Sequence, residues 1–188
     1  MKTYLILLRG VNVGGKNKVS MAELKKYLEE LRFLSVTTFI ASGNVLLRSK
    51  KTPTQIQSEI EALIPKKFKL DSKSIKVLVV SRTQLESVIR SKPKGFGAQP
   101  KKYHNDVIFL MDIKTAQAMP VFKPREGVDT IWPGKNVVYS QRLSAQRTKS
   151  RLGAIMVSPL YKSMTIRTWT TTTKLLDILK NIDTKKDA

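Results

Sequence analysis

The sequence predicts an α+β fold, because two successive parts of the chain show the same order of strand-like and helix-like segments. The chain has 188 residues, of which 41% are apolar. That is enough to bury a core, and it argues against disorder throughout the chain. Each part has the order strand, helix, strand, strand, helix, strand, which is that of a ferredoxin-like α/β plait. We therefore expect two tandem ferredoxin-like (βαββαβ) subdomains followed by an extra C-terminal helix.

The first expected subdomain covers residues 1–91. Ser20-Met21-Ala22-Glu23 is a capping box, which predicts that a helix begins there and runs to about Arg32. Pro53 is well suited to the first position of a second helix, whose apolar residues recur at helical spacing. Ser42-Gly43 predicts a short hairpin between two strands. Strands are expected over residues 3–8, 36–41, 44–49 and 75–80, and a further helix over 83–90.

A segment rich in Lys, Pro and Gly, residues 92–104, predicts a linker. The second subdomain is expected over residues 105–188. Pro133-Gly134 predicts the turn of its hairpin. Strands are expected over residues 106–111, 128–132, 136–140 and 164–169, and helices over 113–119, 148–156 and 171–182.

The charge of the chain is far from balanced. Lys and Arg total 35 and Asp and Glu total 14, so the net charge is 35 − 14 = +21. From Thr130 to Leu176 the chain has eight basic residues and no acidic one. A charge of this sign is typical of proteins that bind nucleic acid, although it also serves solubility alone.

The composition excludes several classes of protein. The chain has no Cys, which excludes a disulfide scaffold, a thiolate zinc site and a Cys nucleophile. No apolar run approaches the ~18 residues of a membrane span, and the N-terminal apolar stretch is too short for a signal peptide. We therefore expect a cytoplasmic protein that does not bind membranes.

A glycine-rich loop, residues 9–18, follows the first expected strand. Its pattern is one residue short of a phosphate-binding P-loop, because Asn17 stands where Ser or Thr would hold magnesium. The helix is also expected to start at Ser20 rather than at Lys16, which argues against a P-loop nucleotidase. Two interpretations remain open. The glycines let backbone amides converge on an anion between Arg9 and Lys18, or they only supply the turn of a flexible loop.

A second basic segment contains Arg147, Lys149 and Arg151, with Ser150 among them, at the expected start of the helix over 148–156. Cations, hydroxyls and amides at a helix start suit a phosphate group. These residues are therefore candidates for a phosphate site.

Arg167 and Trp169 are expected to share one face of the strand before the last helix. Such a pair can stack a base and neutralise its phosphate, but Trp169 can equally anchor the last helix in the core.

No recognisable catalytic constellation stands out, and whether the chain is an enzyme stays open. His104 is the single histidine, and Asp106, two residues later, can lie on the same strand face to orient it as a base. A structural histidine is the simpler interpretation. The few scattered carboxylates suggest no metal site, and no cofactor is expected.

Three stretches in two blocks, residues 7–49 and 147–179, carry a resemblance to a known family. LLRGVNVGGKNKVSMAEL and TFIASGNVLLRS resemble the opening of the bacterial family called domain of unknown function 1697. RTKSRLGAIMVSPLYKSMTIRTWTTTTKLLDIL is similar to its C-terminal pattern, although Thr168 and Thr170 stand where Asn is common. The resemblance implies two tandem α/β plait subdomains and no established activity.

The leading hypothesis is a basic module that binds a phosphate-rich ligand, nucleic acid first. One alternative is an enzyme or binder that holds a phosphorylated or nucleotide small molecule between the subdomains, and another is a structural homo-oligomer without ligand. A continuous basic surface favours a polymer, and a closed pocket favours a small anion. The candidate ligand-binding residues are Arg9, Asn12, Gly14, Gly15, Lys16, Asn17, Lys18, Ser42, Asn44, Arg147, Lys149, Ser150, Arg151, Arg167, Trp169 and Lys174.

Overall fold

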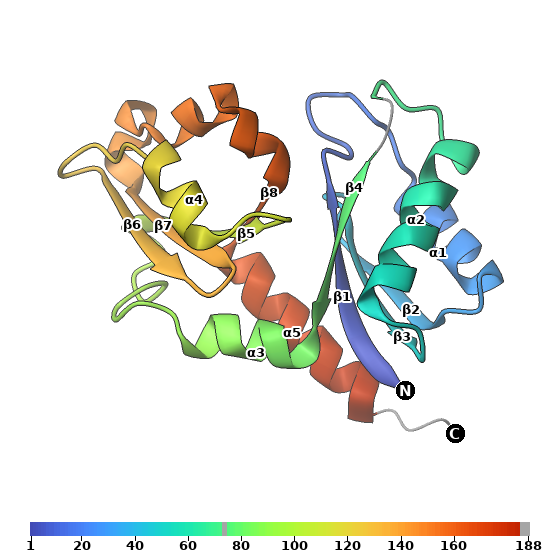
Figure 1. Ribbon diagram of the computed structural model, residues 1–188. Helices are drawn as coiled ribbons and strands as arrows, with labels where there is room; N and C mark the ends of the chain where they lie inside the picture. The colour runs from blue at the N-terminus through green and yellow to red at the C-terminus, as the bar shows by residue number, and fades with distance from the viewer. Residues whose placement is uncertain (73–74, 185–188) are drawn as a thin grey trace. The chain divides into compact units, whose positions relative to one another are not determined.

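The chain forms two compact units in the computed structural model, which describes residues 1–72 and 75–184 (Figure 1). The first unit consists of Met1–Glu86 and Leu175–Ala188, and the second of Ser87–Lys174. The boundaries fall inside two helices, α3 (Arg82–Arg90) and α5 (Trp169–Thr184). The last part of the chain therefore belongs to the first unit.

The first unit is a split β-α-β plait. Its four strands are antiparallel in the order β2-β3-β1-β4, and Figure 1 shows α1 and α2 together on one side of this sheet. This is the expected topology. Besides parts of α3 and α5, its elements are β1 (Lys2–Arg9), α1 (Met21–Glu30), β2 (Leu34–Phe39), β3 (Asn44–Ser49), α2 (Pro53–Lys67) and β4 (Lys76–Ser81).

Local signals explain the two helices of the first unit. The Ser20 side chain accepts the Glu23 N–H at the start of α1, as the capping box predicts. Thr52 and Gln55 form a full capping box ahead of Pro53, which starts α2. Apolar residues of both helices are buried against alternate residues of β1 and β3, which gives the unit one core.

The second unit repeats the same sheet topology. Its strands are antiparallel in the order β6-β7-β5-β8, and its core includes Ile108, Val138 and Met164 from the sheet. Besides parts of α3 and α5, its elements are β5 (Tyr103–Leu110), α4 (Thr115–Ala118), η1 (Met119–Val121), β6 (Asp129–Gly134), β7 (Val137–Leu143), η2 (Ser144–Lys149), η3 (Leu152–Val157), η4 (Pro159–Ser163) and β8 (Met164–Thr168), where η marks a 3-10 helix.

The prediction of an α-helix over residues 148–156 is wrong. The chain there forms 3-10 turns instead, with Gln146 outside helical geometry and Ser150 extended. The Ser150 hydroxyl accepts the Leu152 N–H, which is a local alternative to a helix. Leu152 and Ile155 are both buried, and their spacing of three fits a 3-10 helix as well as an α-helix.

Two further local predictions in the second unit are wrong. The hairpin turn does not lie at Pro133-Gly134, because β6 continues through both residues and Asn136, at φ 59°, lies in the turn. Gly134 instead allows a close approach, since a Cβ there would lie 2.6 Å from the Tyr139 ring. Trp169 starts α5 rather than ending β8, so it does not share a strand face with Arg167.

The expected linker belongs to the second unit, and part of it packs in that unit's interior. The Phe96 ring makes edge contacts with Trp132, Tyr139 and Trp169, at centroid distances of 6.1, 5.3 and 5.3 Å. The Tyr139 hydroxyl donates to the Val88 carbonyl at 2.6 Å, and burial raises the pKa of Tyr139 to about 12. Trp169 therefore has a packing role at the start of α5.

Candidate functional site

The glycine-rich loop forms a small hairpin of its own. Val13 pairs with Lys16 across Gly14 and Gly15, both of which have positive φ. The helix α1 begins only at Met21, so the loop lacks the helix start that a P-loop needs at its lysine. Gly14, Gly15, Lys16 and Lys18 are exposed at the surface of the first unit.

Two asparagine side chains hold this loop in place. Asn12 Nδ2 donates to the carbonyls of Val19 and Ala41, at 2.9 and 2.8 Å, and its Oδ1 accepts the Val19 N–H. Asn17 Nδ2 donates to the Gly10 carbonyl at 2.9 Å. The amides that the sequence offered as ligand contacts are therefore used within the fold.

The second candidate segment of the first unit lies beside the loop. The N–H of Leu8 donates to the Gly43 carbonyl at 2.8 Å, and Asn12 reaches Ala41 next to it. Asn44 Nδ2 donates to the Ser42 hydroxyl and to the Phe39 carbonyl. The structure thus brings residues 9–18 and 42–44 together, with Ser42 and Asn44 in turn contacts.

A carboxylate lies against the loop. Asp71 accepts the Asn17 N–H at 2.5 Å, and Asn17 Oδ1 accepts N–H groups from Asp71 and Ser72 at 2.9 and 3.0 Å. The negative charge of Asp71 opposes an anion at this amide. The loop is therefore a poorer anion site than its glycines and lysines indicate.

In the second unit, the basic segment is a loop anchored at both ends beside the start of β6. The N–H of Leu143 donates to the Val128 carbonyl, and the N–H of Arg151 donates to Asp129 Oδ2, both at 2.9 Å. The intervening residues Arg147 and Lys149 are exposed. The anchors fix where these two cations emerge from the second unit.

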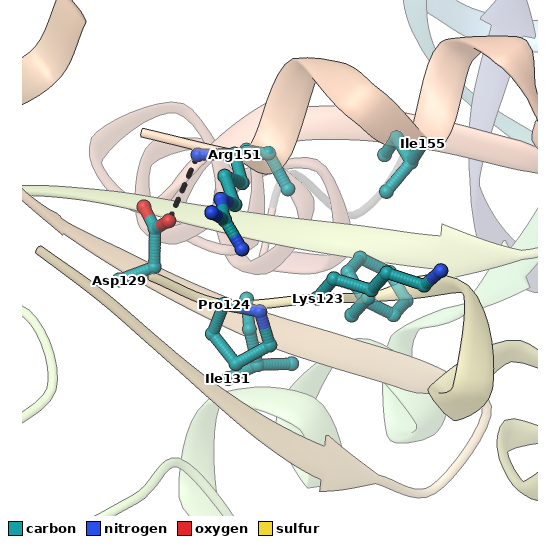
Figure 2. Close-up of a pocket in the computed structure, with 8 residues that line it drawn as sticks. Lys123, Pro124, Asp129, Ile131, Arg151 and Ile155 are labelled. Atoms are coloured by element: carbon teal, nitrogen blue, oxygen red, sulfur yellow. Dashed lines mark hydrogen bonds between the residues drawn. The ribbon is translucent and has the colours of Figure 1, made fainter. Parts of the chain in front are cut away.

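The Asp129 carboxylate also binds a second basic segment, residues 123–125. Asp129 Oδ2 also accepts the Arg125 N–H at 3.0 Å, and Figure 2 shows Lys123 and Arg151 lining one small hollow. Five exposed cations from two separate segments therefore gather around the start of β6. We call this set the basic cluster: Lys123, Arg125, Arg147, Lys149 and Arg151.

The basic cluster has little compensating charge. Among the described residues, none of its five members takes part in an ion pair. Glu126 is the exposed carboxylate next to it in the sequence, whereas Asp129 is buried and bound to backbone amides. The cluster therefore presents positive charge to solvent.

The cluster surrounds no enclosed cavity of useful size. The hollow between Lys123, Asp129 and Arg151 has a volume of about 10 Å³, which is space for one water molecule. Its lining includes the apolar side chains of Ile131 and Ile155 (Figure 2). A phosphorylated metabolite does not fit inside this hollow, so a ligand of the basic cluster would lie on the surface.

Asp129 is held in its charged form. Burial alone would raise the pKa of Asp129, but the amides of Arg151 and Arg125 and the Ser150 hydroxyl bring that pKa below its ordinary value. Asp129 is therefore the positioning group of the basic cluster, and Ser150 acts beside it rather than as an exposed ligand contact.

We expect Asp129→Asn to lower the free energy of unfolding by about 1.5–3 kcal/mol near neutral pH, because charge-assisted hydrogen bonds weaken. With its pKa lowered, the Asp129 carboxylate stabilises the fold above the unfolded pKa of about 3.9 and loses this contribution as the pH falls through its folded pKa. The difference from wild type should therefore shrink below about pH 4.

Urea unfolding followed by fluorescence of Trp132 and Trp169 measures this difference in the free energy of unfolding, with Glu126→Gln as control. A difference that stays constant on acidification would contradict this account.

The remaining candidate residues of the second unit, Arg167, Trp169 and Lys174, differ in how deeply they are buried. Arg167 is buried, its Nη1 donates to Thr165 Oγ1 and to the Ile166 carbonyl, and burial lowers its pKa to about 10. Trp169 is half-buried against Phe96, and Lys174 is exposed on α5. Arg167 and Trp169 do not form an exposed stacking platform.

His104 lies at the edge of an ion cluster in which Arg142 pairs with the buried Asp106. Its Nε2 lies 3.3 Å from Asp106 Oδ1, and Arg142 pairs with the other oxygen of the same carboxylate. His104 and Asp106 thus share a strand face, as expected. Because Arg142 already neutralises Asp106, the arrangement favours the structural interpretation of His104.

The first unit has a larger groove beside its edge strand β2. Its volume is about 470 Å³, and α1, β2 and α5 contribute its lining. Lys25 and Glu29 lie on its rim and form an ion pair at 3.8 Å, while Ile178 and Ile182 are apolar. A groove with one cation and one carboxylate has no preference for an anionic ligand.

Residues 1–72 and 75–184 contain neither a metal-binding cluster nor a helix that could span a membrane. No group of three His, Asp or Glu side chains in these ranges is placed to hold a metal ion. No helix in the same ranges is both long and apolar enough to cross a membrane.

Lys123 and Arg125 were not predicted from the sequence as members of the basic cluster. They lie more than 20 residues before Arg147 in the chain, and only the fold of β6 and β7 brings the two segments together. Asp129 was the available signal, because it is the last carboxylate before the acid-free stretch that begins at Thr130.

The fold and the site together define a basic protein of two tandem α/β plait units. The family model described as a protein of unknown function, DUF1697, matches residues 1–139, and the chain belongs to this family. The match confirms the family resemblance, while the C-terminal segment beginning at Arg147 lies beyond the matched residues.

A solved structure shows the same fold. It is described as the conserved bacterial protein SP0830 from Streptococcus pneumoniae, with 23% sequence identity and a TM-score of 0.78. The similarity covers 95% of this chain and 98% of that chain. A comparison with curated proteins finds no match.

Proposed function

We propose that the second unit binds a polyanion, nucleic acid first, through the basic cluster. The observation that supports this most strongly is the shared anchor at Asp129. One carboxylate oxygen accepts the amides of Arg125 and Arg151, so that two distant basic segments form one surface. A cluster fixed in this way loses little freedom when it meets successive phosphates.

The charge balance supports the same proposal. Even if each of the 14 carboxylates paired with one base, 35 − 14 = 21 cations would remain. Six of the eight basic residues between Thr130 and Leu176 are exposed, since Arg142 pairs with Asp106 and Arg167 is buried. Neutralising phosphates with such cations releases condensed counterions, which drives binding to nucleic acid. Nucleic acid is plentiful in the cytoplasm, the location that the composition suggests.

The open surface favours a polymer over a small anion. A small phosphorylated ligand needs an enclosed site that buries most of its surface. The hollow beside the basic cluster has room for no more than about one water molecule, and the groove of the first unit has balanced charge. A chain of phosphates needs only the spaced, exposed cations that the cluster offers.

The test is the salt dependence of binding to fluorescent duplexes and single strands. If all five cluster cations contact phosphates, the slope of log affinity against log salt should be about −4.5 on duplex DNA. Arg147→Ala/Lys149→Ala should make the slope shallower by about 1.8.

The matched control removes the same charge elsewhere. Lys66→Ala/Lys69→Ala takes two exposed lysines from the first unit and should leave the slope unchanged. Absence of binding at about 50 mM salt, or equal slopes for the two double variants, would overturn the proposal.

A further inference from the structure

Two exposed apolar side chains follow the basic cluster. Met156 is 61% exposed and Val157 90% exposed at the end of η3. Within Ser87–Lys174, all of which the structure describes, these are the exposed large apolar side chains. We call Met156 and Val157 the apolar tip. Leaving such groups in water forgoes the free energy of burying them, so the tip is a candidate contact surface.

The apolar tip is held firmly. Leu152 and Ile155, on the same 3-10 segment, are buried in the second core. The Ala154 N–H donates to the Arg151 carbonyl and the Ser158 N–H donates to the Ile155 carbonyl, both at 3.0 Å. Since Arg151 is anchored to Asp129, the 3-10 segment that carries the tip starts from a fixed point of the basic cluster.

The surroundings of the tip define the partner. Arg151 and Lys162 are exposed on either side of it in the sequence, and Thr130–Leu176 contains no carboxylate. The partner must therefore offer negative charge together with an apolar surface. The apolar tip consists of two large apolar side chains on one 3-10 turn. A membrane-surface helix needs a much longer apolar face.

Nucleic acid offers both negative charge and apolar base surfaces. The burial of this protein's aromatic side chains indicates whether the partner is single-stranded or double-stranded. Proteins that bind single strands stack bases on exposed aromatic rings. Here the two Trp, five Tyr and six Phe side chains, all within the described residues, are buried or half-buried. A duplex instead accepts an aliphatic wedge, such as Met, between base steps of the minor groove.

We propose that Met156 and Val157 insert as a wedge between base pairs of double-stranded DNA while the basic cluster holds its phosphates. This inference rests on the proposed function and names its substrate. The wedge unstacks one base step and kinks the duplex, so that more phosphates reach the cations.

The test separates the wedge from the charges. Met156→Ser/Val157→Ser keeps every cation, so the salt slope on a duplex should stay as in wild type, while affinity falls about tenfold at each salt concentration. A duplex with 2-aminopurine at its centre should brighten on binding wild type and not the variant, because only the wedge unstacks bases. Leu34→Ser, at another exposed apolar side chain, is the control and should behave as wild type.

The outcomes are distinguishable. Absence of binding to any nucleic acid overturns both the proposed function and the wedge. Binding with unchanged affinity and no 2-aminopurine signal in either protein overturns the wedge alone. Tighter binding to single strands than to the duplex, or tip-dependent binding to vesicles of phosphatidylglycerol without DNA binding, also overturns it.

Discussion

Replacing Asp106 with alanine is expected to lower the free energy of unfolding of the second unit by about 3–5 kcal/mol. Asp106 is 3% exposed, forms an ion pair with Arg142 and lies beside His104 Nε2. Its removal leaves the charge of Arg142 in a largely buried position. Arg142 Nε is itself buried and makes no hydrogen bond within the described part of the chain, so nothing else at that atom compensates.

The expected loss lies toward the lower end of this range. Asp129 pairs in strand register with Arg142 and retains part of the compensating charge. Urea unfolding followed by tryptophan fluorescence measures the effect directly, because both Trp residues belong to the second unit.

Two controls separate lost charge pairing from lost packing. Asp106→Leu/Arg142→Met replaces the ion pair by apolar groups and should be less destabilised than Asp106→Ala, because no charge is left buried alone. Glu126→Ala, at an exposed carboxylate, should change stability by less than about 0.5 kcal/mol. If Asp106→Ala stayed within about 1 kcal/mol of wild type, the ion cluster would not support the fold.

Gly43→Ala should be the most damaging alanine substitution in the glycine loop and its neighbouring turn. Gly43 has φ +76°, which costs a side chain about 1–2 kcal/mol. A Cβ there would also lie 2.5 Å from Val11 Cγ2 and 2.8 Å from Leu8 Cβ, and such overpacking adds about 1–3 kcal/mol. The loop and β1 cannot retreat easily, because the Leu8 N–H is bonded to the Gly43 carbonyl.

Gly15→Ala is the matched control for this prediction. Gly15 has φ +77° and nothing within 4 Å of an added Cβ, so it shares the backbone cost without the clash. Thermal unfolding by circular dichroism, with hydrogen exchange of the β1 amides, measures both variants. Equal destabilisation of the two would show that the close approach of Gly43 to Leu8 and Val11 has no energetic role.

Much of the fold could be predicted from the sequence, because local signals and tertiary packing agree there. Ser20 and Pro53 mark helix starts through backbone chemistry that needs no distant partner. The consecutive apolar residues of β1 are typical of a buried strand, and β1 lies between β3 and β4. The same order of strands and helices in both parts of the chain was then enough to predict two plait units.

The errors arose where two conformations satisfy the same pattern. Leu152 and Ile155 fit an α-helix and a 3-10 helix equally, and the Ser150 hydroxyl favours the latter. Gly134 resembles a turn residue, yet it is needed under the Tyr139 ring. The candidate site was incomplete for a different reason, because hydrogen bonds from the Arg125 and Arg151 amides to Asp129 join two segments that are far apart in the sequence.

Hydrogen exchange of the whole chain, with and without a 20-base-pair DNA duplex, tests the central claim most directly. The proposed function and the wedge together predict slower exchange at residues 123–125 and 147–157, with the glycine-rich loop at residues 9–18 unchanged. Protection confined to the glycine-rich loop, or no protection anywhere under conditions in which the duplex is bound, would contradict the assignment of DNA binding to the basic cluster.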